Sequence, residues 1–86
     1  MKVAFTEEGW EDYISRNADK RMTKRAHRLI ADIQRGENEG LGEPEPLRGD
    51  LAGWWSRRID GGNRLVYRVA GGAVQIAQCG GHYGDK

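Results

Sequence analysis

The chain has little of several residue types, and each shortage narrows what the protein can be. Its 86 residues include a single cysteine, Cys79, so no internal disulfide can form, which fits a reducing compartment. Apolar runs are only a few residues long, which excludes a transmembrane helix and the core of a signal peptide. We therefore expect a cytoplasmic protein of one domain, residues 1–86, without a membrane partner.

Net charge is also small, at +1, so the total charge gives no argument for a nucleic-acid partner. The charges are instead segregated along the chain. Acidic residues gather at Glu7, Glu8, Glu11 and Asp12, and basic residues at Lys20, Arg21, Lys24, Arg25 and Arg28. This pattern predicts faces of opposite sign. On the residues alone, such a basic block is more often a solvated helix face than an RNA contact.

The first part of the sequence predicts a strand and two helices. Residues 2–5 form a strand candidate, and Thr6 can cap the helix that follows. The apolar face of that helix carries Trp10, Tyr13 and Ile14. This helix ends near Asn17, which can cap a second helix over residues 18–35, and Gly36 is its expected stop. The apolar stripe of the second helix consists of Met22, Ala26, Leu29, Ile30 and Ile33.

The second half of the sequence predicts three strands. Residues 51–68 have the pattern of a β-hairpin, and residues 73–79 that of a further strand in which Val74 and Ile76 alternate with other residues. The resulting order is β-α-α-β-β-β. It predicts an α+β domain with both helices packed on one face of a mostly antiparallel sheet.

The alternation within the hairpin assigns its residues to two faces. It favours a three-residue loop, Gly61-Gly62-Asn63, with a glycine bulge. The pairs expected across this loop are Ile59 with Leu65, Arg57 with Tyr67, and Trp55 with Val69. The core face then carries Trp55, Ile59, Leu65, Tyr67 and Val69. The opposite face, here called the cationic platform, carries Trp54, Ser56, Arg58, Arg64, Val66 and Arg68, and fixed guanidinium groups suit phosphate recognition.

The only two prolines of the chain flank one acidic residue, in the sequence Pro44-Glu45-Pro46. They stand in a long segment, residues 36–53, that is rich in glycine and acids, and such loops are usually functional or disordered. Proline fixes its own φ and pushes the preceding residue towards extended conformations, so Glu45 is constrained from both sides. The residues alone favour an ordinary exposed acid on a stiffened connection.

Several kinds of site have little support. No glycine pair stands in a strand-to-helix turn followed by Lys-Ser or Lys-Thr, as a phosphate-binding loop requires. Cys79 and His82 have the spacing of half a zinc site, but the second pair is missing and His27 does not supply it. Ser56 has no base nearby in the sequence. We therefore expect neither a metal nor a cofactor.

What remains is a set of residues suited to metal-free cleavage of RNA, namely Glu45, Arg58, Arg64, His82 and Tyr83. In this chemistry a base takes the proton of a ribose 2′-hydroxyl, which attacks the adjacent phosphate while an acid protonates the leaving oxygen. Cations stabilise the charge that develops on the phosphate. Histidine titrates near neutrality, arginine stays charged, and tyrosine can stack on a base. Taken singly, each of these residues is more often a surface or packing residue.

The chain resembles the YoeB/Txe family of toxins, within the RelE-like superfamily, in the segments MKVAFTEEGWEDY, EPEPLRGDLAGWWSRRIDGGNRLVYRV and IAQCGGHY. The resemblance covers nearly the whole chain and implies the RelE-like, microbial-RNase-like fold. It also implies the toxin of a type II toxin–antitoxin pair, an endoribonuclease that cleaves mRNA in the ribosomal A site and inhibits translation. The implied partners are a YefM/Axe-like antitoxin, the ribosome with its mRNA, and a second copy in a homodimer.

The resemblance also implies a role for each member of the acid–base set. Glu45 matches the general base and His82 the general acid. Arg64, helped by Arg58, matches the group that stabilises the scissile phosphate. Tyr83 matches the aromatic residue that positions the substrate.

Further contacts follow from the same resemblance and from the cationic platform. Arg48 stands where the family has a basic residue, which implies a substrate or ribosomal RNA contact. Trp54 and Arg68 of the platform are expected to bind substrate. The resemblance implies that ribosomal RNA lies against the basic residues of the second helix, Lys20, Lys24, Arg25 and Arg28. Such phosphate attraction is salt-sensitive.

Two departures from the family pattern lie at the end of the chain. The pair Gly80-Gly81 replaces a bulky Arg-Tyr pair, and the chain continues with Gly84-Asp85-Lys86 after the tyrosine. Because glycine gives the backbone more freedom, both departures predict a loosened segment around His82 and Tyr83.

Two other functions remain open on the sequence. One is a toxin of the same fold that poisons a protein target such as gyrase without catalysis, although such a protein has no reason to keep Glu45, His82 and Tyr83 together. The other is a non-enzymatic RNA-binding module, which needs the arginines of the platform but not His82.

Overall fold

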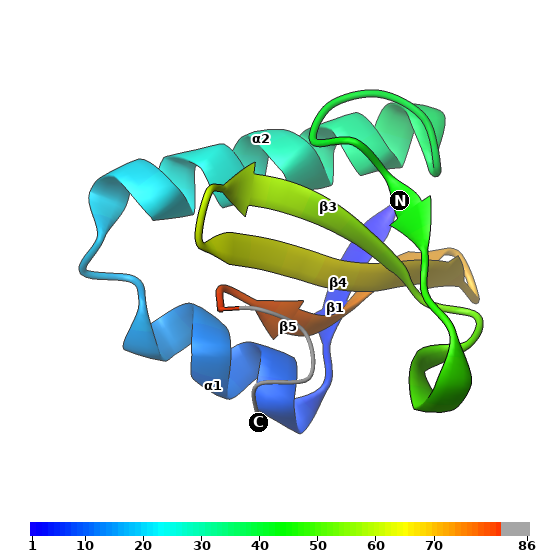
Figure 1. Cartoon of the computed structure of the whole chain (residues 1–86), viewed down its shortest axis with the longest axis horizontal. Coiled ribbons are helices and arrows are strands. Elements are labelled where there is room, and N and C mark those ends of the chain that lie inside the picture. Colours follow the sequence, from blue (N-terminus) through cyan, green and yellow to red (C-terminus); the bar gives the residue numbers. More distant parts are fainter. Residues whose placement is uncertain (82–86) are drawn as a thin grey trace.

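A computed structural model describes residues 1–81 of the chain, which fold into one mixed sheet with two helices (Figure 1). The sheet has five strands in the order β1-β5-β4-β3-β2. The strands are β1 (Lys2–Phe5), β2 (Glu45–Pro46), β3 (Trp55–Asp60), β4 (Asn63–Ala70) and β5 (Ala73–Cys79). Only β1 and β5 pair in parallel. The predicted α+β fold with a mostly antiparallel sheet is thereby confirmed.

Helix α2 (Lys20–Gly36) supplies one half of the core. The buried residues of this helix are the predicted stripe Met22, Ala26, Leu29, Ile30 and Ile33. They pack against the sheet residues Ile59, Leu65, Tyr67, Val74, Ile76 and Cys79. The start of the helix differs from the prediction, because Asp19 and not Asn17 is its N-cap, accepting a hydrogen bond from the Met22 N–H (3.1 Å). An aspartate carboxylate is among the best acceptors at this position.

Helix α1 (Glu7–Ser15) is capped by Thr6, as predicted, and lies along β5 beyond the end of β1. Gly9 permits this approach, because it is buried against the backbone carbonyl of Ile76. The apolar face of the helix is only partly covered. Trp10 and Ile14 keep 49% and 51% of their surface exposed, and the rings of Trp10 and Tyr13 pack with Phe5.

The predicted three-residue loop of the hairpin is wrong. Asp60 pairs with Asn63 across a two-residue loop, Gly61-Gly62, and the register shifts between Arg58 and Asp60. The physical reason is that the Asp60 carboxylate closes the turn by accepting from Gly62 N–H (2.9 Å) and Asn63 Nδ2 (2.9 Å). The irregularity therefore falls at Ile59 rather than at a glycine, and the observed pairs are Trp55 with Tyr67, Ser56 with Val66, Arg57 with Leu65, and Arg58 with Arg64. The division into two faces survives because the shift restores the alternation.

The long segment between α2 and β3 is more ordered than a plain loop. Residues 45 and 46 form β2, and a short 3₁₀ helix, η1 (Gly49–Leu51), follows it. Glu45 is therefore part of an edge strand, where it was expected on a loop. Within residues 1–81, neither helix combines the length and the apolar character of a membrane span.

Candidate functional site

The face of the sheet turned away from α2 brings the arginines of the cationic platform together. Arg58 of β3 pairs directly with Arg64 of β4, and Ser56 pairs with Val66 on the same face. Directly opposed residues of an antiparallel pair lie within side-chain reach of each other. The hairpin thus holds Arg58 and Arg64 side by side on a rigid support.

Glu45 joins the platform from the edge strand β2. Its backbone pairs with Ser56, and its Oε1 lies 3.5 Å from the Arg64 guanidinium. Arg64 also donates to Ser56 Oγ (3.1 Å), and only 19% of its side chain is exposed, against 47% for Glu45. The arginine is therefore fixed from two sides, whereas the carboxylate remains open to a substrate. A partly exposed carboxylate beside a fixed guanidinium can accept a proton next to a bound phosphate.

The end of β5 is tied to the same arginine. The Arg64 N–H donates to Gly81 O (2.9 Å), and the Gly80 N–H donates to Arg64 O (2.9 Å). The remaining polar groups of the glycine pair bind Asn63 Oδ1 (2.8 Å) and Gln78 Nε2 (3.1 Å). All four backbone groups of Gly80-Gly81 are thus hydrogen-bonded, which differs from the loosening expected of this pair.

Two members of the predicted set cannot be placed. His82 and Tyr83 lie outside the described residues, as does the predicted effect of the extension Gly84-Asp85-Lys86. The structure therefore brings together Glu45, Arg58 and Arg64, and its description ends at the residue before His82.

A second acidic residue, Glu43, occupies the other platform arginine. Its carboxylate lies 3.1 Å from the Arg58 guanidinium, and both side chains are exposed. The backbone of Glu43 has a φ of +53°, next to Gly42, whose carbonyl accepts from the Arg58 N–H (2.7 Å). Because exposed ion pairs contribute little, an incoming phosphate can displace Glu43 from Arg58 at small cost.

Trp54 and Arg68 form a stacked pair at the edge of the platform. The Arg68 guanidinium lies 4.4 Å from the centre of the Trp54 ring, and its Nε donates to Gln75 Oε1 (2.7 Å). Arg68 is exposed and Trp54 is half-buried, so the pair offers a flat surface to a nucleobase. Arg48, at the start of η1, is also exposed.

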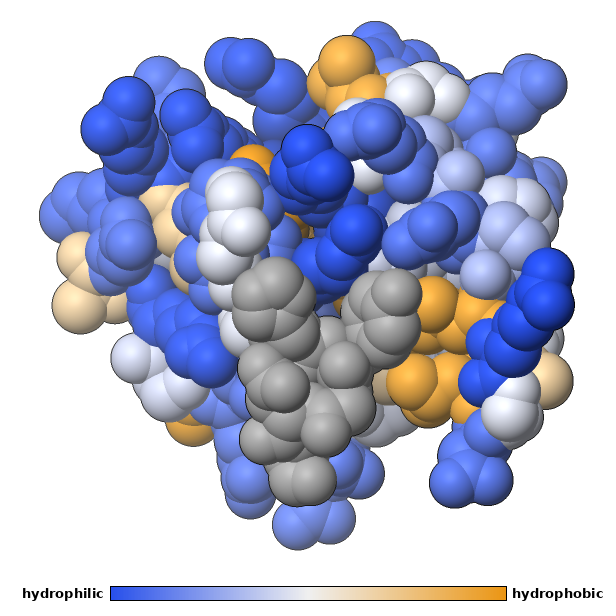
Figure 2. Space-filling model, in the orientation of Figure 1, coloured by the Kyte–Doolittle hydropathy of each residue, from blue (hydrophilic) through white to orange (hydrophobic). Residues whose placement is uncertain are grey.

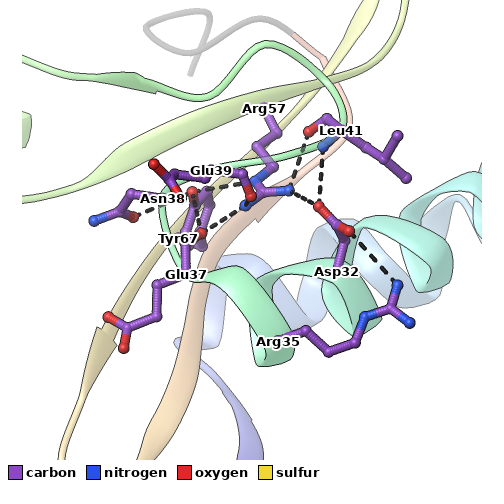
Figure 3. Close-up of polar contacts among 8 residues, drawn as sticks. All are labelled: Asp32, Arg35, Glu37, Asn38, Glu39, Leu41, Arg57 and Tyr67. Atoms are coloured by element: carbon purple, nitrogen blue, oxygen red, sulfur yellow. Dashed lines mark hydrogen bonds and ion pairs between the residues drawn. The ribbon is translucent and has the colours of Figure 1, made fainter.

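The residue that the sequence reasoning missed is Arg57, which alternation places on the core face. Its side chain is fully buried and donates five hydrogen bonds, to Asp32, Tyr67 and the carbonyls of Glu37, Glu39 and Leu41 (Figure 3). The shortest of these bonds join it to Asp32 Oδ2 and Glu37 O, each at 2.6 Å. The network fixes the start of the segment that carries Glu43 and Glu45. A buried arginine within an alternating strand was the only available signal.

The remaining candidates divide into surface and interior. The predicted ribosomal contacts Lys20, Lys24, Arg25 and Arg28 are all exposed on α2, and hydrophilic side chains cover much of the surface along this helix (Figure 2). Cys79 is buried at the end of β5, and burial raises the pKa of its thiol to about 11. The thiol is therefore protonated at neutral pH, which does not suit a nucleophile.

Comparison with known proteins gives matches over nearly the whole chain. A family model described as the YoeB-like toxin of bacterial type II toxin–antitoxin systems matches residues 5–83. The toxin YoeB of Streptomyces coelicolor is 51% identical over 84 residues, which cover 96% of this chain and 100% of that protein. The solved YoeB/ParE toxin from Agrobacterium tumefaciens is 44% identical, with a TM-score of 0.90 over 96% of this chain and 100% of that one.

Two solved structures from Staphylococcus aureus show assemblies of a similar chain. One is a heterotetrameric complex of YoeB and YefM, toxin and antitoxin, whose similar chain is 39% identical with a TM-score of 0.87. The other is a YoeB dimer, 40% identical with a TM-score of 0.87. Each match covers 96% of this chain and 98% of the other.

Proposed function

This chain belongs to the YoeB-like toxin family of bacterial type II toxin–antitoxin systems, and from that premise we propose that it is an endoribonuclease that cleaves mRNA in the ribosomal A site. The single observation that supports the chemistry most strongly is the pairing of Glu45 with Arg64 at 3.5 Å. It unites a half-exposed carboxylate with a fixed cation, and the backbone of the same arginine binds Gly81, the residue before His82.

In the proposed reaction Glu45 takes the proton of the ribose 2′-hydroxyl. The 2′-oxygen attacks the adjacent phosphorus, and the bond from phosphorus to the 5′-oxygen breaks. His82 donates a proton to that leaving oxygen, so the products are a 2′,3′-cyclic phosphate and a 5′-hydroxyl. Arg64 and Arg58 stabilise the charge that develops on the phosphoryl oxygens, and Arg58 does so after Glu43 is displaced.

The surroundings of the pair suit a single-stranded RNA substrate. Trp54, stacked with Arg68, offers a surface for a base next to the cleaved bond, and Tyr83 is proposed to hold another. Arg48 extends the positive charge along the path of the strand. We assign the ribosomal RNA contact to the exposed basic residues of α2, Lys20, Lys24, Arg25 and Arg28.

The proposed partners follow from the same platform. A YefM/Axe-like antitoxin inhibits the site by laying an acidic or amphipathic disordered segment across it, where carboxylates replace the phosphates. The S. aureus relatives form such a complex and also a dimer, and we propose both assemblies for this chain.

The test is to map new 5′ ends on translated and untranslated mRNA after expression of the wild-type chain and of the Glu45→Gln, His82→Gln double variant. We expect ends only on translated message, and a loss of about 100-fold or more in the variant, the size of a general acid–base contribution. Glu39→Gln is the matched control, because Glu39 is an exposed acid of the neighbouring segment. Growth arrest without new ends, unchanged in the double variant, would contradict the proposal and point to a protein target.

A further inference from the structure

Arg16 occupies an unusual position for a residue at the end of a helix. It is the C-cap of α1, and its side chain reaches the end of β5. The Cδ and Nε atoms of Arg16 stand where a Cβ on Gly80 would be, and its NH2 atom lies 3.2 Å from where a Cβ on Gly81 would be. The guanidinium therefore rests directly on the backbone of the glycine pair.

Packing rather than polar pairing holds this side chain. The Nε atom is buried and has no hydrogen-bond partner within residues 1–81. Buried polar atoms are rarely left unpaired, so the position of Arg16 requires an explanation other than its own hydrogen bonding. Both glycines have positive φ values, +112° for Gly80 and +73° for Gly81, which disfavour any side chain there. Arg16 thus fills the space that the absent side chains leave.

The glycine pair is held on its other sides by the four hydrogen bonds already described, two of which join it to Arg64. Arg16 closes the side that these bonds leave uncovered. The segment is therefore enclosed by α1 and β4 at the point where the chain reaches the proposed site, one residue before His82.

We infer that Arg16 is a positioning residue: by packing on Gly80-Gly81 it fixes the end of β5 against Arg64 and so aligns the chain that enters the proposed RNA-cleaving site. This inference rests on the proposed function. It requires the shape of a long side chain more than its charge, because the Nε atom makes no hydrogen bond.

Amide hydrogen exchange tests the packing without any assay of activity. In the Arg16→Ala variant we expect severalfold faster exchange of the Gly80 and Gly81 amides and unchanged exchange of the Tyr67 amide in the core. Arg16→Met keeps the long side chain and is expected to restore most of the protection. Arg35→Ala removes the same charge from an exposed site and serves as the control.

Kinetics then test the positioning role. Misplacement of a reacting group lowers turnover, so Arg16→Ala is expected to reduce kcat by about 10- to 100-fold, with KM changed by less than about threefold. Because Arg16 acts through the segment that leads to His82, adding Arg16→Ala to His82→Gln is expected to cause no further loss of the residual rate.

Three results would overturn the inference while leaving the proposed function intact. They are unchanged exchange at both glycines in Arg16→Ala, faster exchange with an unchanged kcat, and the same loss of rate in the His82→Gln background as in the wild type. If the wild-type chain cleaves no RNA, the proposed function and the positioning role fail together. The exchange rates still show in that case whether Arg16 holds the glycine pair.

Discussion

Arg57 combines a charge with complete burial, and its neighbours explain how the fold tolerates it. Each of the five N–H groups of its guanidinium has an acceptor, and the carboxylate of Asp32 balances the charge. Removing one partner of such a pair leaves a buried charge without compensation, which typically costs about 3–5 kcal/mol. The network joins the end of α2 to β3, so it also sets the starting point of the segment that presents Glu43 and Glu45.

Asp32 gives this network a pH dependence. A hydrogen bond from the Leu41 N–H, followed by the bond from Arg57, holds the pKa of the Asp32 carboxyl below its usual 3.8. A carboxyl whose pKa is lowered by folding stabilises the folded state above its unfolded pKa, and that stability is lost as the pH falls through the folded value. We expect wild-type protein to lose stability as the pH falls below about 4, and Asp32→Asn to show a smaller loss over that range.

Thermal unfolding midpoints between pH 7 and pH 2 measure this difference. Asp50→Asn is the control, because Asp50 is exposed. Asp60 also has a lowered pKa, chiefly through the Gly62 N–H, so part of the acid sensitivity remains in Asp32→Asn. Equal slopes for wild type and Asp32→Asn would contradict this role of the network.

Helix α1 and strand β5 approach each other more closely than any side chain at position 9 allows. A Cβ on Gly9 would overlap the backbone carbonyl of Ile76, which cannot move without disturbing the sheet. We expect Gly9→Ala to destabilise the protein by about 1–3 kcal/mol, the usual cost of overpacking. Denaturant unfolding measures the change.

Gly36 offers a matched control for this substitution within the same fold. It is the last residue of α2, and no atom lies within 4 Å of the position of an added Cβ. Because alanine favours a helix over glycine, Gly36→Ala is expected to be neutral or to stabilise by up to about 1 kcal/mol. Equal free energies of unfolding for Gly9→Ala and Gly36→Ala would show that the close approach of α1 to β5 is unimportant.

The elements that the sequence predicted are those with a long periodic signal. The stripe of α2 spans four turns, so the buried residues from Met22 to Ile33 were all identified. Strand β2 has only two residues, too few for any alternation to appear, and the bulge at Ile59 depends on how the Asp60 side chain closes the turn. Neither feature is encoded in a periodicity.

The candidate site was predicted to a similar extent and for similar reasons. Alternation placed Arg58 and Arg64 on one face, as the structure shows. The contact of Glu45 with Arg64 depends on the pairing of β2 with β3, and the burial of Arg57 on a partner 25 residues earlier, Asp32. Such long-range contacts leave no mark on the local pattern. The positions of His82 and Tyr83 remain predictions, outside the described residues.

On the scale of the whole molecule, the sheet separates two positively charged surfaces. The cationic platform lies on the face turned away from α2, and the basic residues of α2 are exposed on the other side of the core. A protein with a net charge of only +1 thus concentrates its cations where we propose that mRNA and ribosomal RNA bind. The acidic residues of α1 lie apart from both surfaces in the sequence.

The central claim is that the ribose 2′-hydroxyl of the mRNA is the nucleophile, activated by Glu45 beside Arg64. The most direct measurement is cleavage, on the ribosome, of an mRNA that carries a single 2′-deoxynucleotide immediately 5′ to the bond that is cut. Without the hydroxyl there is no proton for Glu45 to take and no oxygen to attack the phosphate. We expect that bond to stay intact while the all-ribose message is cut at the same position. Cleavage of the deoxy-substituted bond at the wild-type rate would contradict the mechanism.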